Sequence, residues 1–124
     1  MPMKLIIAGG RDYVLDSVGE GKLNRLRDEL GVSKVVCGCA RGADTEGEEW
    51  AVRNEIDVVF FPADWDKFGG SAGFIRNIEM AKVADAVVLF PGGKGTAHMY
   101  KEASRLGLKI FDYRGASGTT ELFL

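Results

Sequence analysis

The stretch DAVVLFPGGKGTAHM, residues 85–99, contains an apolar run, then Pro91, then three glycines within four residues. The run predicts a strand over residues 85–93. The proline and glycines at its end weaken a strand's hydrogen-bond ladder and mark a turn. Apolar residues at helical spacing follow Thr96. A strand, a glycine-rich turn and a helix in succession are typical of one repeat of a parallel α/β sheet.

Four further runs have the same form, each a short apolar segment bounded by glycine, proline or polar residues. They cover residues 4–10, 34–38, 57–63 and 109–113. The runs are continuously apolar and rich in valine and isoleucine, which favours strands that are covered on both faces. Together the five runs predict a mostly parallel five-stranded sheet.

Stretches of helical length lie between the predicted strands, in residues 43–54, in residues 72–83 and after Thr96. Their apolar residues recur at helical spacing. The predicted inward stripes are Ala43, Gly47, Trp50 and Ala51; Phe74, Ile75, Ile78 and Ala81; and Met99, Ala103 and Leu106. This alternation predicts an α/β fold, a Rossmann-like three-layer sandwich with right-handed crossovers and strand order 3-2-1-4-5.

Length and charge limit the domain number and the type of partner. At 124 residues and 46% apolar composition, the chain is long enough for one core, so we expect a single domain over residues 1–124. Sixteen basic and eighteen acidic residues give a net charge of −2. This charge argues against a broad basic surface for duplex DNA and allows a small positive pocket. The tail, residues 114–124, fits either a loop or a segment docked on a sheet edge or another subunit.

The cysteines and the hydropathy favour an intracellular protein. Cys37 and Cys39 are the only cysteines, too few for a zinc quartet or a disulfide framework, so we expect two free thiols and no metal site. No stretch approaches the roughly 20 apolar residues that cross a bilayer. We expect a cytoplasmic protein with no membrane partner and no bound cofactor.

Three of the predicted strands end in glycine: AGGRDY, CGCARGAD and FPGGKGTA. Ligands of open parallel sheets bind beyond the carboxyl ends of the strands, so these turns predict a crevice there. Glycine amides with positive φ at Gly92, Gly93 and Gly95, together with a helix capped by Thr96, suit a phosphate. The spacing matches neither a Walker A motif nor a dinucleotide fingerprint.

Three arginines complete the predicted phosphate site, because a guanidinium group contacts phosphate through two parallel hydrogen bonds. Solvated surface arginines are the alternative for each one taken singly. The predicted phosphate-binding residues are Gly9, Gly10, Arg11, Gly38, Arg41, Gly42, Asp44, Arg76, Gly92, Gly93, Gly95 and Thr96.

Other residues near the predicted crevice have two interpretations each. Asp44 suits a helix cap better than an acceptor for a ribose hydroxyl. Trp65, in the loop after the third strand, fits either stacking on a base or closing the core. Gly69, Gly70 and Gly73 make the same loop a candidate lid.

Five motifs in order, GGRDY, ARGAD, PADW, AGFIRN and FPGGKGTA, resemble the YspA-like stand-alone domains of the SLOG superfamily, found in bacteria and their phages. This superfamily also contains the LOG (Lonely Guy) phosphoribohydrolases and the DNA-processing Smf proteins. The resemblance covers residues 5 to about 110. It implies a Rossmann-like domain that binds a nucleotide or a nucleotide-derived ligand and forms a homodimer or a higher homo-oligomer.

The resemblance leaves the activity open. In LOG enzymes a glutamate of the motif P-G-G-x-G-T-x-x-E acts with an upstream arginine, and we assign these positions to His98 and Arg76, the candidate catalytic residues. A neutral histidine stabilises a positive charge on ribose poorly, although Asp44 or Glu79 offers a substitute carboxylate. We therefore favour a binding or sensing module. The alternatives are a nucleoside-phosphate phosphoribohydrolase and a protein that binds single-stranded DNA, as Smf proteins do.

Overall fold

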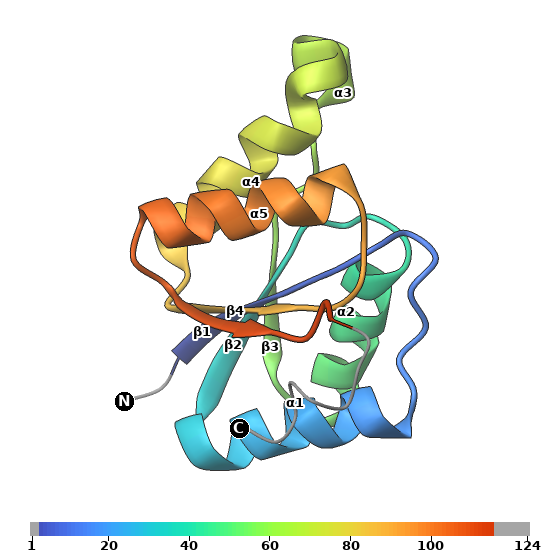
Figure 1. Cartoon of the computed structure of the whole chain (residues 1–124), viewed down its shortest axis with the longest axis vertical. Coiled ribbons are helices and arrows are strands. Elements are labelled where there is room, and N and C mark those ends of the chain that lie inside the picture. The colour runs from blue at the N-terminus through green and yellow to red at the C-terminus, as the bar shows by residue number, and fades with distance from the viewer. Residues whose placement is uncertain (1–2, 116–124) are drawn as a thin grey trace.

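A computed structural model describes residues 3–115 of the chain, and its centre is a five-stranded sheet (Figure 1). All four strand pairs are parallel, and the order is β3-β2-β1-β4-β5. The strands are β1 (Met3–Ala8), β2 (Val32–Cys37), β3 (Asp57–Phe60), β4 (Ala86–Leu89) and β5 (Lys109–Asp112). The predicted Rossmann-like fold and strand order are confirmed.

The strands are shorter than predicted at their carboxyl ends. Strand β4 ends at Leu89, although two bonds continue beyond it: Phe90 N donates to Ala8 O and Gly10 N donates to Pro91 O, both at 2.8 Å. Proline has no N–H for the ladder, so pairing cannot continue through Pro91. The glycines that follow the strands therefore belong to loops.

Helices cover both faces of the sheet, so the fold has three layers (Figure 1). On one face lie α1 (Ser17–Leu30) and α2 (Ala43–Arg53), and on the other lie α4 (Ala72–Val83) and α5 (Lys94–Arg105). The short helix α3 (Trp65–Phe68) and a 3-10 turn (Gly69–Ser71) precede α4 and project away from the sheet. Within residues 3–115, no helix is both long and apolar enough to span a membrane.

Two helices were not anticipated from the sequence. Helix α1 begins where the Asp16 side chain accepts a hydrogen bond from Gly19 N at 2.8 Å, and it ends at Gly31, whose φ is 68°. The segment predicted as a glycine-rich loop after β3 instead begins with α3, capped by Asp64, which accepts from Lys67 N. Both helices begin at aspartate caps, and the spacing of apolar residues gives no sign of such caps.

Alternate side chains of β1, β2, β4 and β5 lie in two separate cores. Leu5 and Ile7 of β1 pack with residues of α1 and α2, whereas Ile6 and Ala8 pack with residues of α4 and α5. Trp50 is fully buried in the first core, and its indole N–H donates to Asn24 Oδ1 at 2.9 Å. Because β1, β2, β4 and β5 each contribute to both cores, these strands cannot change register by one residue without misplacing apolar side chains.

The predicted helix stripes are only partly right. All four residues of the α2 stripe are buried, but Phe74 of α4 is 44% exposed and Leu106, after α5, is 37% exposed. The buried face of α4 consists of Ala72, Asn77, Met80 and Ala81. The first turn of α4 lies next to α3, which projects away from the sheet (Figure 1), and the Phe74 ring packs against the His98 ring.

Helix α2 approaches β1 closely at Gly47, where an added Cβ would lie 2.9 Å from Ile7 Cβ. We predict that Gly47→Ala lowers the free energy of unfolding by roughly 1–3 kcal/mol through overpacking. The matched control is Gly21→Ala in α1, where an added Cβ meets no atom within 4 Å. This control should gain about 0.5–1 kcal/mol from its lower backbone entropy in the unfolded state. Urea unfolding measures the free energy of unfolding of both variants. An equal increase for Gly47→Ala and Gly21→Ala would show that α2 is not closely packed on β1 at Gly47.

Candidate functional site

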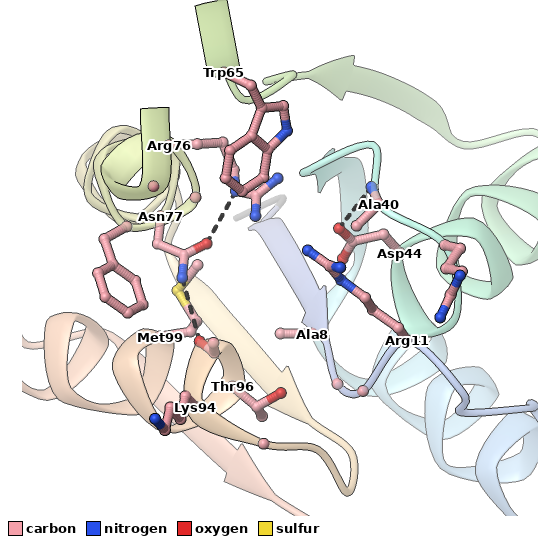
Figure 2. Close-up of a pocket in the computed structure, with 18 residues that line it drawn as sticks. Ala8, Arg11, Ala40, Asp44, Trp65, Arg76, Asn77, Lys94, Thr96 and Met99 are labelled. Carbon is pink, nitrogen blue, oxygen red and sulfur yellow. Dashed lines mark hydrogen bonds between the residues drawn. The ribbon is translucent and has the colours of Figure 1, made fainter. Parts of the chain in front are cut away.

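The loops after β1, β2 and β4 meet around a cavity of about 440 Å³ at the carboxyl edge of the sheet. The first turns of α4 and α5 and the indole of Trp65 complete its wall (Figure 2). Ten of the residues proposed from the sequence line it: Gly9, Gly10, Arg11, Arg41, Asp44, Trp65, Arg76, Gly93, Gly95 and Thr96. The predicted crevice therefore exists, and its lining extends from Ala8 at the end of β1 to Met99 in α5.

Gly42 and Gly92 lie outside this lining, because they serve the packing of the loops on one another. Gly42 has a φ of 79°, and an added Cβ would collide with the Gly10 carbonyl. A Cβ on Gly92 would lie 2.6 Å from Gly10 N. The prediction of positive φ at Gly92, Gly93 and Gly95 is wrong, because among the described glycines only Gly31, Gly42, Gly69 and Gly107 have it.

The charges around the cavity are strongly one-sided. Four cationic side chains line it, from Arg11, Arg41, Arg76 and Lys94, against the single carboxylate of Asp44. Within residues 3–115, neither Arg11 nor Lys94 makes a side-chain hydrogen bond or ion pair, and Arg41 has only a 3.9 Å contact with the exposed Asp12. Three cations are thus free to meet an anion, in a chain whose net charge is −2.

Arg76 is held in place before any ligand arrives. One of its terminal nitrogens donates to the carbonyl of Gly38, and its Nε donates to Asn77 Oδ1 at 3.1 Å. Figure 2 shows the Arg76 guanidinium beneath the Trp65 indole, facing Asp44 and Arg11 across the cavity. Gly38 lies outside the first cavity and acts through this carbonyl.

Asn77 is a site residue that the sequence analysis missed. It is 7% exposed, lines the cavity, and donates through Nδ2 to Gly95 O at 3.2 Å while its Oδ1 accepts from Arg76. A side-chain amide can do both because it carries a donor and an acceptor. Asn77 thereby joins the guanidinium to the first turn of α5. Its place directly after Arg76 was the only signal in the sequence.

Asp44 stabilises a loop and does not cap α2. The N-cap is Gly42, and Asp44 Oδ2 accepts from Ala40 N at 3.1 Å. Burial raises the pKa of the Asp44 carboxyl above its usual value, while the Ala40 hydrogen bond and the nearby Arg76 charge act in the opposite direction. The predicted cap was wrong because α2 begins at Ala43, after the N-cap Gly42, so Asp44 already lies inside the helix.

Thr96 likewise lies inside its helix. Helix α5 begins at Lys94 after the N-cap Gly93, which leaves Thr96 in the first turn, 5% exposed and lining the cavity. The predicted cap at Thr96 is therefore wrong. The cavity is still lined by the N-terminus of α5, from Gly93 to Thr96, and the first backbone N–H groups of a helix have no helical acceptors.

His98 lies behind the cavity, not in its wall. Its ring stacks at a tilt on Phe74 with centroids 4.4 Å apart, and its Nδ1 is 3.3 Å from Asn77 Nδ2. The side chain is 17% exposed, so most of the imidazole is shielded from water. Burial lowers the pKa of the imidazole below its ordinary value, partly opposed by the charge of Glu102.

Met99, and not His98 as the sequence analysis assigned, occupies the glutamate position of the LOG motif. Counting P-G-G-x-G-T-x-x-E from Pro91 places the glutamate at position 99, so the assignment was one residue short. Met99 is 2% exposed and lines the cavity. The proposed substitute carboxylate of Glu79 is exposed and lies outside the lining, which leaves Asp44 as the carboxylate of the described cavity wall.

Trp65, of α3, lines the cavity mouth and is 52% exposed. Closure of the core by Trp65 is thereby contradicted. Gly70 and Gly73 of the candidate lid also line the cavity, and Gly69 does not. The thiols of Cys37 and Cys39 are free, Cys37 being buried. Residues 3–115 contain no group of three or more histidine, cysteine, aspartate or glutamate side chains placed to hold a metal ion.

Comparison with known proteins identifies the family. The profile of the YspA, cpYpsA-related SLOG family matches residues 3–68. The chain belongs to this SLOG family. The Gene 61 protein of Mycobacterium phage D29 is 39% identical over 100 residues, an alignment that covers 71% of this chain and 80% of the phage protein. The resemblance inferred from the five motifs is confirmed.

Two solved structures share the SLOG fold. DNA processing protein A (DprA) of Streptococcus pneumoniae aligns with a TM-score of 0.66 and 18% identity, over 90% of this chain and 50% of the DprA chain. The protein TM1055, a structural-genomics target, aligns with a TM-score of 0.66 and 21% identity, over 99% of this chain and 80% of its own. At these identities the likeness shows the fold alone. The SLOG chain spans half the length of the DprA chain.

The raised pKa of Asp44 gives a test of its environment. The folded state binds more protons than the unfolded state between the two pKa values, so the free energy of unfolding falls as the pH rises through that window. Asparagine keeps the acceptor for Ala40 N and removes this loss. We predict that Asp44→Asn is at least as stable as wild type at pH 7, and that its advantage shrinks as the pH falls below the usual carboxyl pKa of 3.8.

The matched control is Asp112→Asn, because the Arg114 side-chain hydrogen bond lowers the pKa of Asp112. That variant should lose stability at pH 7 and regain parity in acid, the opposite sign. Urea unfolding at a series of pH values measures both. Destabilisation by Asp44→Asn at pH 7 that vanishes in acid would show that attraction to Arg76 outweighs the burial of Asp44.

Proposed function

We propose that this SLOG domain binds a nucleotide or a nucleotide-derived ligand through its phosphate, as a binding or sensing module. The observation that carries the proposal is the convergence of four cationic side chains and one carboxylate on a cavity at the N-terminus of α5. Helix N-termini favour anions, and arginine pairs with phosphate oxygens through two parallel hydrogen bonds. A homodimer, a single domain and a cytoplasmic location stay predictions.

The uncharged parts of a nucleotide have partners in the same wall. The exposed indole of Trp65 offers a surface on which a base would stack. Asp44 would accept a hydrogen bond from a ribose hydroxyl, since its Oδ2 already accepts from Ala40 N and its Oδ1 accepts no hydrogen bond from another residue in 3–115. Phosphate, ribose and base thus find contacts within one cavity of about 440 Å³, a size usual for small-molecule sites.

A phosphoribohydrolase is the alternative that Met99 disfavours. A buried methionine offers no negative charge to an oxocarbenium-like transition state where LOG enzymes have glutamate. Asp44 is the remaining carboxylate of the described wall, and burial raises its pKa, which disfavours the charged form that the transition state needs. Binding without chemistry is therefore the function that this wall supports best.

Gly93 gives a direct test of phosphate binding. It lines the cavity at the N-cap of α5, and an added Cβ meets no atom within 4 Å. We predict that Gly93→Val keeps the fold and weakens nucleotide binding by at least about tenfold, because the side chain occupies the space of the phosphate. Calorimetric titration with nucleoside monophosphates measures binding, and thermal unfolding checks the fold. Gly21→Val, in open space on α1, is the control and should bind as wild type.

Binding by Gly93→Val as tight as wild type would contradict the phosphate site. The single-stranded DNA alternative is tested in the same titrations at two salt concentrations. Several phosphate contacts to an oligonucleotide give a log-log slope of about −0.7 per contact, far steeper than one mononucleotide gives. Tight, steeply salt-dependent binding of an oligonucleotide without mononucleotide binding would replace the proposed ligand with DNA.

Incubation with nucleoside monophosphates separates the binding module from the hydrolase. We predict that the wild-type protein binds its monophosphate and releases no free base above the rate without protein, because position 99 lacks a carboxylate. Chromatographic detection of free base measures this, with Asp44→Asn alongside. Base release by the wild type that Asp44→Asn abolishes would contradict the prediction and make Asp44 the catalytic carboxylate.

A further inference from the structure

A second cavity, of about 350 Å³, adjoins the first. Five residues line both cavities: Arg11, Ala40, Arg41, Trp65 and Arg76. The second cavity continues past this shared wall to Gly38, Cys39, Pro62 and Ala63, in the loops after β2 and β3. The two cavities are therefore adjoining parts of one cleft, and the ligand described above accounts for only the first.

The shared wall carries more positive charge than one phosphate requires. All three arginines of the cleft line both cavities, and the second cavity is lined by no carboxylate within residues 3–115. Arg76 is fixed by Gly38 and Asn77, while Arg11 makes no side-chain hydrogen bond or ion pair among the described residues. Three guanidinium groups at one boundary suit two linked phosphates.

The rest of the second cavity is uncharged. Beyond the arginines and Trp65, its lining consists of small residues and Pro62, with no aspartate, glutamate or lysine. Such a wall would receive an uncharged group and would leave a further phosphate without a partner of its own. The cleft thus has three parts in order: the glycine loops with the α5 N-terminus, the three arginines, and a small uncharged cavity.

Resting on the proposed function, we propose that the cleft is a bipartite site for a nucleoside diphosphate that carries a second, uncharged group on its β-phosphate. The first cavity holds the nucleoside and its α-phosphate. Arg11, Arg41 and Arg76 contact the linked phosphates, and the second cavity holds the second group. Nucleotide sugars have this chemistry.

Cys39 reports on the second cavity. It lines that cavity, does not line the first, and is exposed, whereas Cys37 is 2% exposed. Alkylation by iodoacetamide, followed by mass spectrometry, therefore reads the occupancy of the second cavity at one thiol. Cys39→Ser supplies the unreactive control.

The experiment compares three matched series: AMP, ADP and ADP-glucose; GMP, GDP and GDP-mannose; UMP, UDP and UDP-glucose. In at least one series we expect the nucleotide sugar to bind roughly tenfold tighter than the monophosphate and to slow Cys39 alkylation severalfold. The monophosphate should bind and leave the alkylation rate unchanged. The diphosphate shows how much of the added affinity comes from the second phosphate and how much comes from the second group.

Ala63→Phe tests the same cavity by filling it. Ala63 lines the second cavity and not the first. The variant should therefore lose the additional affinity for the nucleotide sugar and keep its affinity for the monophosphate. The control is Ala97→Phe, an exposed alanine of α5 that lines neither cavity. If Ala63→Phe does not fold, the Cys39 measurement on the unaltered protein decides.

The outcomes separate this inference from the proposed function. Monophosphate binding with no tighter binding of the sugar in any series, or a bound nucleotide sugar that leaves Cys39 alkylation unchanged, overturns the bipartite site and leaves the proposed function standing. Protection of Cys39 by a monophosphate alone also overturns it, because the nucleoside itself then fills the second cavity. Binding of none of the nine compounds overturns both.

Discussion

The close packing of three loops around the backbone of Gly10 is the constraint on which the site depends. The Gly10 carbonyl accepts from Tyr13 N at 3.2 Å and from Ala43 N at 3.1 Å, and Gly10 N donates to Pro91 O at 2.8 Å. These bonds join the end of β1 to the first residue of α2 and to the loop before α5. A Cβ at Gly42 or Gly92 would collide with this backbone, so glycine is required there.

This packing explains why the glycine-rich turns surround the cavity although only some of their glycines line it. Gly42 and Gly92 bring the loops together, while Gly93 and Gly95 line the cavity that the packing creates. The cations then come from residues beside the glycines, such as Arg11, Arg41 and Lys94. The closely packed loops thus place long side chains and helix N-termini around one cavity. Asn77 joins the N-terminus of α5 to Arg76 through its side-chain amide.

The fold was predictable because continuous apolar runs and helical stripes are repeated, local signals. Strand order, parallel pairing and the α2 stripe all followed from them. The site was predictable in outline, since strand ends of a parallel sheet meet at one edge. Its details were not: Asp44 and Thr96 lie inside their helices because the N-caps are the glycines Gly42 and Gly93. Asn77 matters only because its amide joins two elements. Such roles depend on distances between segments, which spacing along the chain does not encode.

The polar connections behind the cavity bear on how binding is separated from chemistry. Asn77 Nδ2 lies 3.3 Å from His98 Nδ1, and His98 Nε2 lies 3.7 Å from Glu102, which Arg105 also contacts. The lowered pKa of His98 keeps its imidazole neutral at pH 7, so Nδ1 can accept from the Asn77 amide. This arrangement fixes the amide so that its oxygen faces Arg76. The titratable groups of α5 thereby support the guanidinium from behind the wall, while buried Met99 faces the cavity in their place. A wall of this kind suits an anion and would offer an attached sugar little negative charge, which is the physical basis for expecting binding without hydrolysis.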